Sequence, residues 1–125
     1  MKSGFTLIEL ILVIAILGIL AISAIPKFFD LADKAEEAVE SGIAGSVRSG
    51  VALYAANVVV GGGDFTYPTS LDSATTGNAS SSNPFFTNVL QNGVTSGWNK
   101  VGNQYRYQPT NTLYQYNSTT GTFAP

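Results

Sequence analysis

The chain opens with an apolar run that is long enough to cross a membrane. From Phe5 to Ile25 only three side chains are polar, those of Thr6, Glu9 and Ser23. A helix of this length rises roughly 30 Å, which is the thickness of the hydrocarbon core of a bilayer. Because the whole chain has 125 residues, the run leaves room for one further domain of modest size.

Two ordinary kinds of apolar N-terminal segment are open at this point, and each fits incompletely. A secretory signal peptide has a shorter apolar stretch followed by a cleavage site of small residues, which Ala21, Ser23 and Ala24 imitate. A single-span membrane anchor accounts for the length of the run, but Glu9 would then cost about 2.5–3.5 kcal/mol inside the hydrocarbon. A carboxylate at such a position is normally paired or functional.

The residues at the start of the run resemble the processing site of type IV prepilins and of the pseudopilins of type II secretion. The resemblance lies in Gly4-Phe5-Thr6-Leu7-Ile8-Glu9 and covers about residues 1–55. It implies that residues 1–4 are a leader peptide, that a prepilin peptidase cleaves between Gly4 and Phe5, and that the new N-terminal Phe5 is methylated.

The same resemblance implies roles for Glu9, Gly18 and Pro26. In this family the glutamate is thought to pair with the terminal amine of Phe5 in an adjacent subunit during assembly. Gly18 and Pro26 fall where family members carry a helix-softening glycine and a kinking proline, and proline in a helix lacks an N–H and clashes with the preceding turn. We expect residues 18–26 to lose helical hydrogen bonds on assembly.

After Pro26 the apolar residues recur every three or four positions, which predicts an amphipathic helix over residues 27–60. No strong stop signal precedes Gly61-Gly62-Gly63, so the sequence predicts one near-continuous helix from Phe5 to about Val60, with residues 5–26 in the membrane or in the core of a filament. The expected apolar stripe consists of Leu31, Ala35, Val39, Ile43, Val47, Val51, Tyr54 and Val58.

Residues 61–125 are predicted to form a small globular head. Its first part, residues 61–100, is rich in Gly, Ser, Thr and Asn and is predicted to be a loop region. We expect Phe65, Tyr67 and Leu71 to attach this loop to the helix and Trp98 to lie in the core. Residues 84–90 are expected to form a short helical turn with Pro84 near its start.

The second part of the head, residues 101–125, alternates apolar and polar residues. Three strands are predicted, Asn103–Gln108, Thr112–Asn117 and Thr120–Phe123, which would form an antiparallel β-meander. The predicted fold class is therefore α+β and pilin-like: a long N-terminal helix with a small C-terminal antiparallel β-meander packed on its C-terminal half.

The composition excludes several kinds of chemistry. The chain has no cysteine and no histidine, so disulfides, Ser–His or Cys–His catalysis, and His/Cys metal sites are excluded. We expect no enzymatic activity, no cofactor and no metal. Nucleic acid is not an expected partner either, because only Lys100 and Arg106 are basic after Arg48.

An acidic set follows the apolar run and consists of Asp30, Asp33, Glu36, Glu37 and Glu40. Its simplest interpretation is a solvated helix face just outside the membrane. Catalysis, calcium binding and ion pairs between subunits, with Lys27, Lys34 or Arg48, are the alternatives. Residues 73–125 contain no acidic residue, so the C-terminal calcium cage that is common in major pseudopilins is not expected.

These observations predict a structural subunit of a bacterial type IV pilus, a homo-oligomer that forms a helical filament. The expected partners are the prepilin peptidase, the inner-membrane assembly platform and, before assembly, inner-membrane lipid. The N-terminus would be cytoplasmic before assembly, and the assembled pilus extracellular. The alternatives are a pseudopilin of a type II secretion system, which acts as a periplasmic piston, and a membrane-anchored binding module that does not polymerise.

Overall fold

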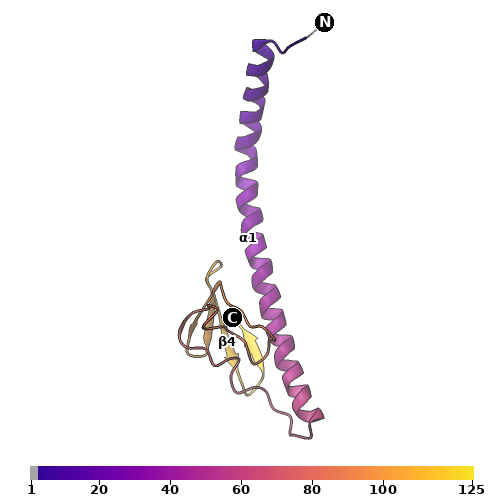
Figure 1. The fold of residues 1–125 in the computed structure, drawn as a ribbon, viewed down its shortest axis with the longest axis vertical. Helices are drawn as coiled ribbons and strands as arrows, with labels where there is room; N and C mark the ends of the chain where they lie inside the picture. Colours follow the sequence, from indigo (N-terminus) through magenta and orange to yellow (C-terminus); the bar gives the residue numbers. More distant parts are fainter. Residues whose placement is uncertain (1–2) are drawn as a thin grey trace. The chain divides into compact units, whose positions relative to one another are not determined.

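The computed structural model describes residues 3–125 and contains one helix followed by a five-stranded antiparallel sheet (Figure 1). The elements are α1 (Leu7–Val60), β1 (Gly77–Asn78), β2 (Trp98–Val101), β3 (Gln104–Tyr107), β4 (Thr112–Asn117) and β5 (Thr122–Ala124). The predicted α+β, pilin-like class is confirmed. Contacts divide the chain into two units, Met1–Ala35 and Glu36–Pro125.

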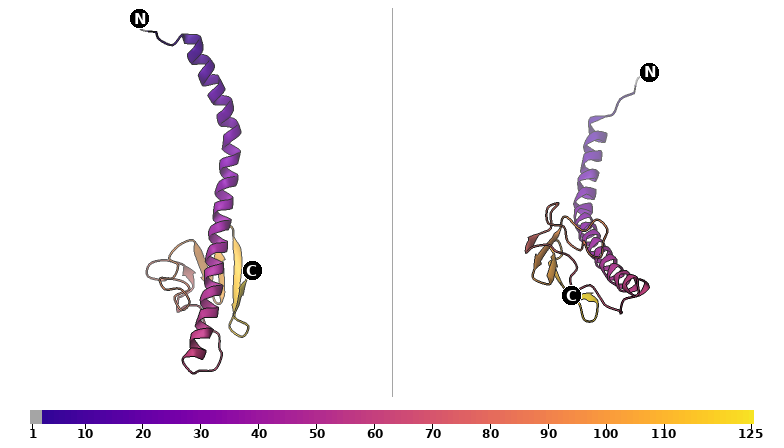
Figure 2. Two further views of the ribbon diagram at one scale, coloured as in Figure 1. Left: turned by 90° about the vertical axis from the view of Figure 1, so that its right-hand side faces the viewer. Right: turned by 60° about the horizontal axis from the view of Figure 1, so that its bottom comes forward.

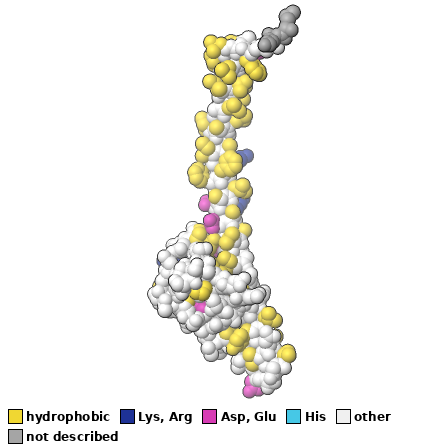
Figure 3. Space-filling model, in the orientation of Figure 1, with side chains coloured by type: hydrophobic (Ala, Val, Ile, Leu, Met, Phe, Trp, Pro, Cys, Tyr) yellow, Lys and Arg dark blue, Asp and Glu magenta, His cyan; other side chains and the backbone are white. Residues whose placement is uncertain are grey.

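The unit Met1–Ala35 consists of the first part of α1 and the residues before it. Apart from the half-buried Ala24, every described residue up to Ala35 is exposed. Figure 3 shows hydrophobic side chains all along the visible face of this segment. By length and composition α1 contains one stretch that could cross a membrane, and none of that stretch is buried within the chain. A helix that is apolar all round needs lipid or other helices to cover it.

Gly18 and Pro26 both lie inside α1 in this structure. Residues 18–26 are helical throughout. The expected loss of helical hydrogen bonds concerns the assembled state, so it stays a prediction.

The unit Glu36–Pro125 packs one face of the sheet against the C-terminal half of α1 (Figure 2). The strands follow the order β1-β2-β3-β4-β5, and all neighbours are antiparallel. Burial alternates along β3 and β4, so every second side chain points to the helix. The core comprises Ala44, Val47, Val51, Leu71, Phe85, Phe86, Trp98, Tyr105, Tyr107, Tyr114, Tyr116 and Phe123.

The sheet is larger than predicted, because β1 and β2 lie in the region that was expected to be loop. Strand β1 is only Gly77–Asn78, two residues with low β-propensity. Strand β2 buries Lys100 as well as Trp98, so its sequence does not alternate between apolar and polar residues. The last predicted strand is shifted: β5 begins at Thr122, because Gly121 N–H closes a turn onto the carbonyl of Asn117 at 2.8 Å.

The buried stripe of α1 differs in part from the predicted one. The prediction is correct for Val47 and Val51, but Val39 and Tyr54 are exposed. The stripe instead consists of Glu40, Ala44, Val47, Val51 and Ala55. Its small side chains let the head approach closely, and a Cβ at Gly50 would lie 2.2 Å from the carbonyl oxygen of Val89.

The glycine run ends α1 as predicted, in a Schellman motif. The N–H of Gly63 donates to the carbonyl of Val58 at 2.9 Å, and that of Gly62 donates to Val59 at 3.0 Å. Gly62 has a φ of 86°, which residues with a side chain rarely adopt. The chain after α1 therefore leaves the helix in a fixed direction.

The loop region attaches to the core at some of the predicted positions only. Leu71 and Trp98 are fully buried, as expected, whereas Phe65 is exposed and packs edge-on against Tyr67 with 5.1 Å between ring centroids. The expected turn after Pro84 is present as one helical hydrogen bond, from Leu90 N–H to the carbonyl of Phe86 at 2.8 Å.

Candidate functional site

The start of α1 is closed by a capping box made of Thr6 and Glu9. The Glu9 N–H donates to Thr6 Oγ1 at 3.3 Å, and the Thr6 N–H donates to Glu9 Oε2 at 2.7 Å. Each side chain thus satisfies a backbone donor that a helix end leaves open. The sequence predicted that the helix begins at Phe5. The cap explains why α1 begins at Leu7 instead.

The bond between Gly4 and Phe5 lies outside the helix as a result. Residues 3–6 have no regular secondary structure, and the Phe5 side chain is 92% exposed. Ser3, Gly4, Phe5 and Glu9 together line a hollow of about 320 Å³. Exposed, non-helical backbone of this kind is where proteases cut most easily.

The Glu9 carboxylate is the one titratable group in this hollow. Its Oε2 accepts from Thr6, while its Oε1 has no hydrogen-bond partner in residues 3–125. The site residues predicted from the sequence include Glu9 but not Thr6. The pattern Thr-x-x-Glu before an apolar run is a local signature and would have found it.

Residues 1–25 match the family model of the prokaryotic N-terminal methylation motif. They form a class III prepilin-type signal. Such signals begin type IV pilins and pseudopilins, which are generally structural proteins that a prepilin peptidase processes. The signal and its N-terminal apolar helix suggest membrane anchoring before assembly.

The prepilin signal covers the first 25 residues, so the head has to be interpreted from its own structure. No curated protein and no solved structure matches the chain. The roles predicted for Gly4, Phe5, Glu9, Gly18 and Pro26 depend on the resemblance and stay predictions.

In the unit Glu36–Pro125, two glutamates of α1 accept hydrogen bonds from tyrosine hydroxyl groups of the sheet. Tyr107 OH donates to Glu36 Oε2 at 2.6 Å, and Tyr114 OH donates to Glu40 Oε1 at 2.8 Å. Thr110 Oγ1 also donates to Glu40. The interpretation of the acidic set as a solvated face is therefore wrong for Glu40, which is only 7% exposed. Glu36 is exposed as predicted, although it also accepts a hydrogen bond from Tyr107.

The electrostatics of Glu40 follow from these contacts. Burial tends to raise the pKa of its carboxyl, but the hydrogen bonds from Thr110, Tyr114 and Thr112 outweigh burial, so the pKa is lowered. Burial and the hydrogen bond to Glu40 raise the pKa of Tyr114 to about 12. The pair is thus held as a carboxylate and a neutral phenol, which is a structural arrangement.

A second buried carboxylate, Asp72, organises the loop region. It accepts from Phe86 N–H at 2.8 Å and from Tyr105 OH at 3.0 Å, and it forms an ion pair with Lys100. Phe86 has a φ of 62°, a strained value for a residue with a side chain. Asp72 therefore fixes an unfavourable backbone turn, and its oxygens are occupied by protein groups.

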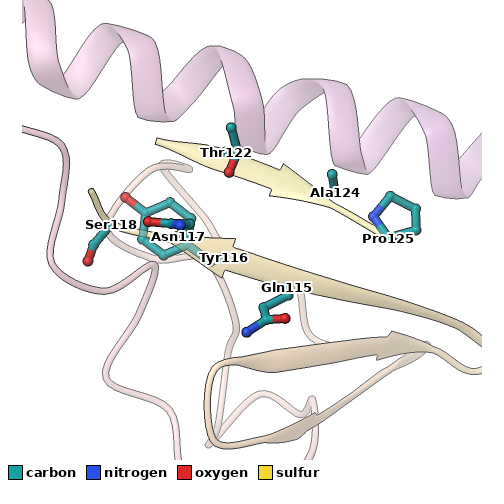
Figure 4. A pocket seen from close by; sticks show the side chains of 7 residues that line it. All are labelled: Gln115, Tyr116, Asn117, Ser118, Thr122, Ala124 and Pro125. Carbon is teal, nitrogen blue, oxygen red and sulfur yellow. The ribbon is translucent and has the colours of Figure 1, made fainter. Parts of the chain in front are cut away.

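The sheet also carries a shallow hollow of about 450 Å³ near the C-terminus (Figure 4). Its lining is Gln115, Tyr116, Asn117, Ser118, Thr122, Ala124 and Pro125. The one ionisable side chain among them, Tyr116, donates its OH to the carbonyl of Pro68 at 2.6 Å. In the part of the chain that the structure describes, no group of three or more acidic residues is arranged to hold a metal ion.

Proposed function

We propose that this chain is a structural subunit of a bacterial type IV pilus, which polymerises into a helical surface filament after cleavage between Gly4 and Phe5. The observation that carries the proposal is the prepilin signal, which is capped at Thr6 and contains an apolar helix that the chain itself leaves uncovered. The proposed functional parts are a leader over residues 1–4, a membrane and filament-core helix over 5–26, an amphipathic helix over 27–60 and a head over 61–125.

The capping box supports the processing step. It holds the first helical turn and leaves the Gly4–Phe5 bond in exposed, irregular backbone, where the membrane-bound prepilin peptidase can reach it. Cleavage removes Lys2 and converts Phe5 into a new N-terminus that carries a positive, methylated amine.

The position of Glu9 supports the assembly step. Its Oε1 accepts no hydrogen bond within residues 3–125, so an outside donor can bind it while Oε2 keeps its bond to Thr6. In a low dielectric, a carboxylate and an ammonium gain most by pairing with each other. The amine of Phe5 in an adjacent subunit is that donor, and the pairing sets the register of the helices. Gly18 and Pro26 let the span deform as it moves from lipid into the filament core.

A pseudopilin of a type II secretion system is the second candidate, because the same signal begins both kinds of protein. The absence of acidic residues from 73 to 125 favours the pilus, since major pseudopilins commonly bind calcium in that region. Deletion of the chain separates the two: a pilus subunit leaves cells without surface filaments, whereas a pseudopilin leaves them unable to secrete exoproteins. Deletion of a membrane-anchored binding module would have neither effect.

The substitution Glu9→Ala tests the proposal directly. We expect the variant to be cleaved and inserted in the membrane, which mass spectrometry of the N-terminus detects, but to form no filaments by electron microscopy. Glu37→Ala, which removes an exposed carboxylate outside the apolar run, is the matched control and should leave filaments intact. A normal filament yield from Glu9→Ala would overturn the proposed role of Glu9.

A further inference from the structure

Most charged side chains of the unit Glu36–Pro125 have a partner within the unit. Glu36 and Glu40 accept from tyrosines, Arg48 Nε donates to the carbonyl of Phe123 at 2.8 Å, and Asp72 pairs with Lys100. Three charges remain without a hydrogen bond or ion pair in the described residues of this unit: Glu37, Asp64 and Arg106. A unit with so few charges presents each unpaired one as a distinct surface feature.

Asp64 lies in an exposed apolar setting at the end of α1, which we call the acidic tip: Val59, Val60, Asp64 and Phe65. The Val60 side chain is 87% exposed and that of Phe65 is 61% exposed. Figure 3 shows hydrophobic side chains gathered over this end of the helix. The Schellman motif at Gly62 and Gly63 holds the following residue in a fixed place, so the acidic tip is preformed.

Arg106 lies in a matching setting on the opposite face of the sheet from α1, which we call the basic face: Asn99, Val101, Gln104, Arg106 and Leu113. These five residues line a hollow of about 200 Å³. Arg106 is paired across the sheet with Asn99 and Leu113, and Val101 is 61% exposed. No acidic residue occurs after Asp72, so nothing nearby in the sequence of the sheet neutralises the guanidinium.

We infer that the acidic tip of one copy of this chain binds the basic face of a second copy, with Asp64 paired to Arg106. The two surfaces are complementary: each has exposed apolar side chains around one unpaired charge, and the charges are opposite. Apolar surroundings remove water from an ion pair and strengthen it. The inference rests on the proposed function, because it names the contact between heads in the filament.

The contact joins two different surfaces, so it is heterologous and repeats from copy to copy. A heterologous contact that does not close into a ring produces an open helical array. Glu37 is the less suitable partner for Arg106, because Lys34 lies three residues before it on α1 and can neutralise its charge. The acidic tip has no basic residue within the same sequence distance.

Charge reversal in the full-length chain tests the pairing. Asp64→Arg and Arg106→Asp should each lower filament yield at least about fivefold, a change that corresponds to roughly 1 kcal/mol per contact. The double variant restores an opposite pair in swapped positions and should recover the yield. Glu37→Arg is the control and should assemble normally. Emission of the single tryptophan, the buried Trp98, verifies that each head is folded. Unchanged yield in both single variants, or no recovery in the double variant, overturns the inference.

Cysteine cross-linking gives a second readout, because the natural chain has no cysteine. Mild oxidation of Asp64→Cys/Arg106→Cys should give a ladder of dimers, trimers and longer species, while Glu37→Cys/Arg106→Cys should stay monomeric. Because the cysteine pair removes the ion pair, filaments are scored in the unsubstituted chain. Its filaments, without a ladder from the cysteine variant, overturn this contact and leave the proposed function standing. A ladder, without filaments of the unsubstituted chain, supports the contact and overturns the pilus assignment. The absence of both overturns both.

Discussion

The same kinds of side chain have opposite environments in the two units of the chain. In Met1–Ala35 the large apolar side chains from Phe5 to Leu31 are exposed, whereas in Glu36–Pro125 the side chains of Trp98, Phe85 and Phe123 are fully buried. The carboxylates differ as well: Glu9 accepts at one oxygen from a residue three positions away, but Glu40 and Asp72 accept from residues far along the chain. The first unit is formed by interactions between residues close in sequence, and it depends on its surroundings to cover its apolar side chains. The second unit is held together by tertiary contacts.

The head achieves this without a disulfide, since the chain has no cysteine. Trp98 lies within 5.6 Å, between ring centroids, of Phe86, Tyr107 and Tyr114. Aromatic pairs at such distances add roughly 0.5–1.5 kcal/mol each beyond the area that they bury. The tyrosine rings fill the core, and their hydroxyl groups donate to acceptors on α1 and on the loop region. These hydrogen bonds attach the sheet to both.

Loss of the Asp72 carboxylate should have the largest effect on the stability of the head, and it tests this contrast between the two units. Asp72→Asn leaves Lys100 buried without its counter-charge, and we expect the head to lose about 3–5 kcal/mol of unfolding free energy. Denaturant unfolding in detergent, followed by Trp98 fluorescence, measures it. Asp64→Asn makes the same chemical change at an exposed site and should leave stability unchanged. Equal stability of the two variants would contradict the role given to Asp72.

A glycine-to-alanine pair sharpens the difference between packed and open helix surface. Gly50→Ala should destabilise the head by about 1–3 kcal/mol, because the added Cβ would meet the carbonyl of Val89. Gly45→Ala meets nothing within 4 Å and should stabilise α1 by about 0.5–1 kcal/mol. The same unfolding measurement decides the sign. If both variants were more stable than the wild type, the close approach at Gly50 would be refuted.

Alkaline pH should weaken the head through its tyrosines. Burial and hydrogen bonds to Glu36 and Glu40 raise the pKa of Tyr107 and of Tyr114 from 10.0 to about 12. Because the folded pKa lies above the unfolded one, this stability is fully present below pH 10 and is lost as the pH rises towards 12. Unfolding curves across that range measure the slope. Tyr107→Phe should reduce the slope, and an unchanged slope would count against this explanation.

The smallest effect on the head should come from Thr6, in the other unit. Thr6→Ala removes the capping box and should loosen the start of α1 by about 1 kcal/mol, with no change in head stability. Hydrogen exchange of the Glu9 and Leu10 amides in micelles reports the fraying. Thr6→Ser keeps the hydroxyl and should behave like the wild type. Slow exchange in Thr6→Ala would show that the cap does not hold the helix end.

The sequence predicts best what depends on neighbouring residues. The apolar run, the glycine stop after Val60 and the alternation of Tyr105, Tyr107, Tyr114 and Tyr116 all follow from local spacing, and they give α1, β3 and β4 nearly in full. The capping box is equally local, since Thr6 and Glu9 are three residues apart, and the pattern could have been read.

What the sequence does not reveal depends on partners far away. Glu40 looks like a surface residue until Tyr114 and Thr110 reach it from 74 and 70 residues further on. Strand β1 is too short to show an alternation of apolar and polar residues, and it forms because Asn78 pairs with Asn99 in β2. Phe65 was expected to attach the loop region to the helix, but it follows closely after the Schellman motif and is exposed.

The hydroxyl contacts between sheet and helix also have a mechanical consequence. They hold α1 at Glu36 and again at Glu40, one turn further on, and Arg48 adds a contact to the carbonyl of Phe123 two turns beyond. A pull along the helix axis is therefore shared among three contacts that lie at different turns of α1. The head is therefore built to stay on its helix under tension.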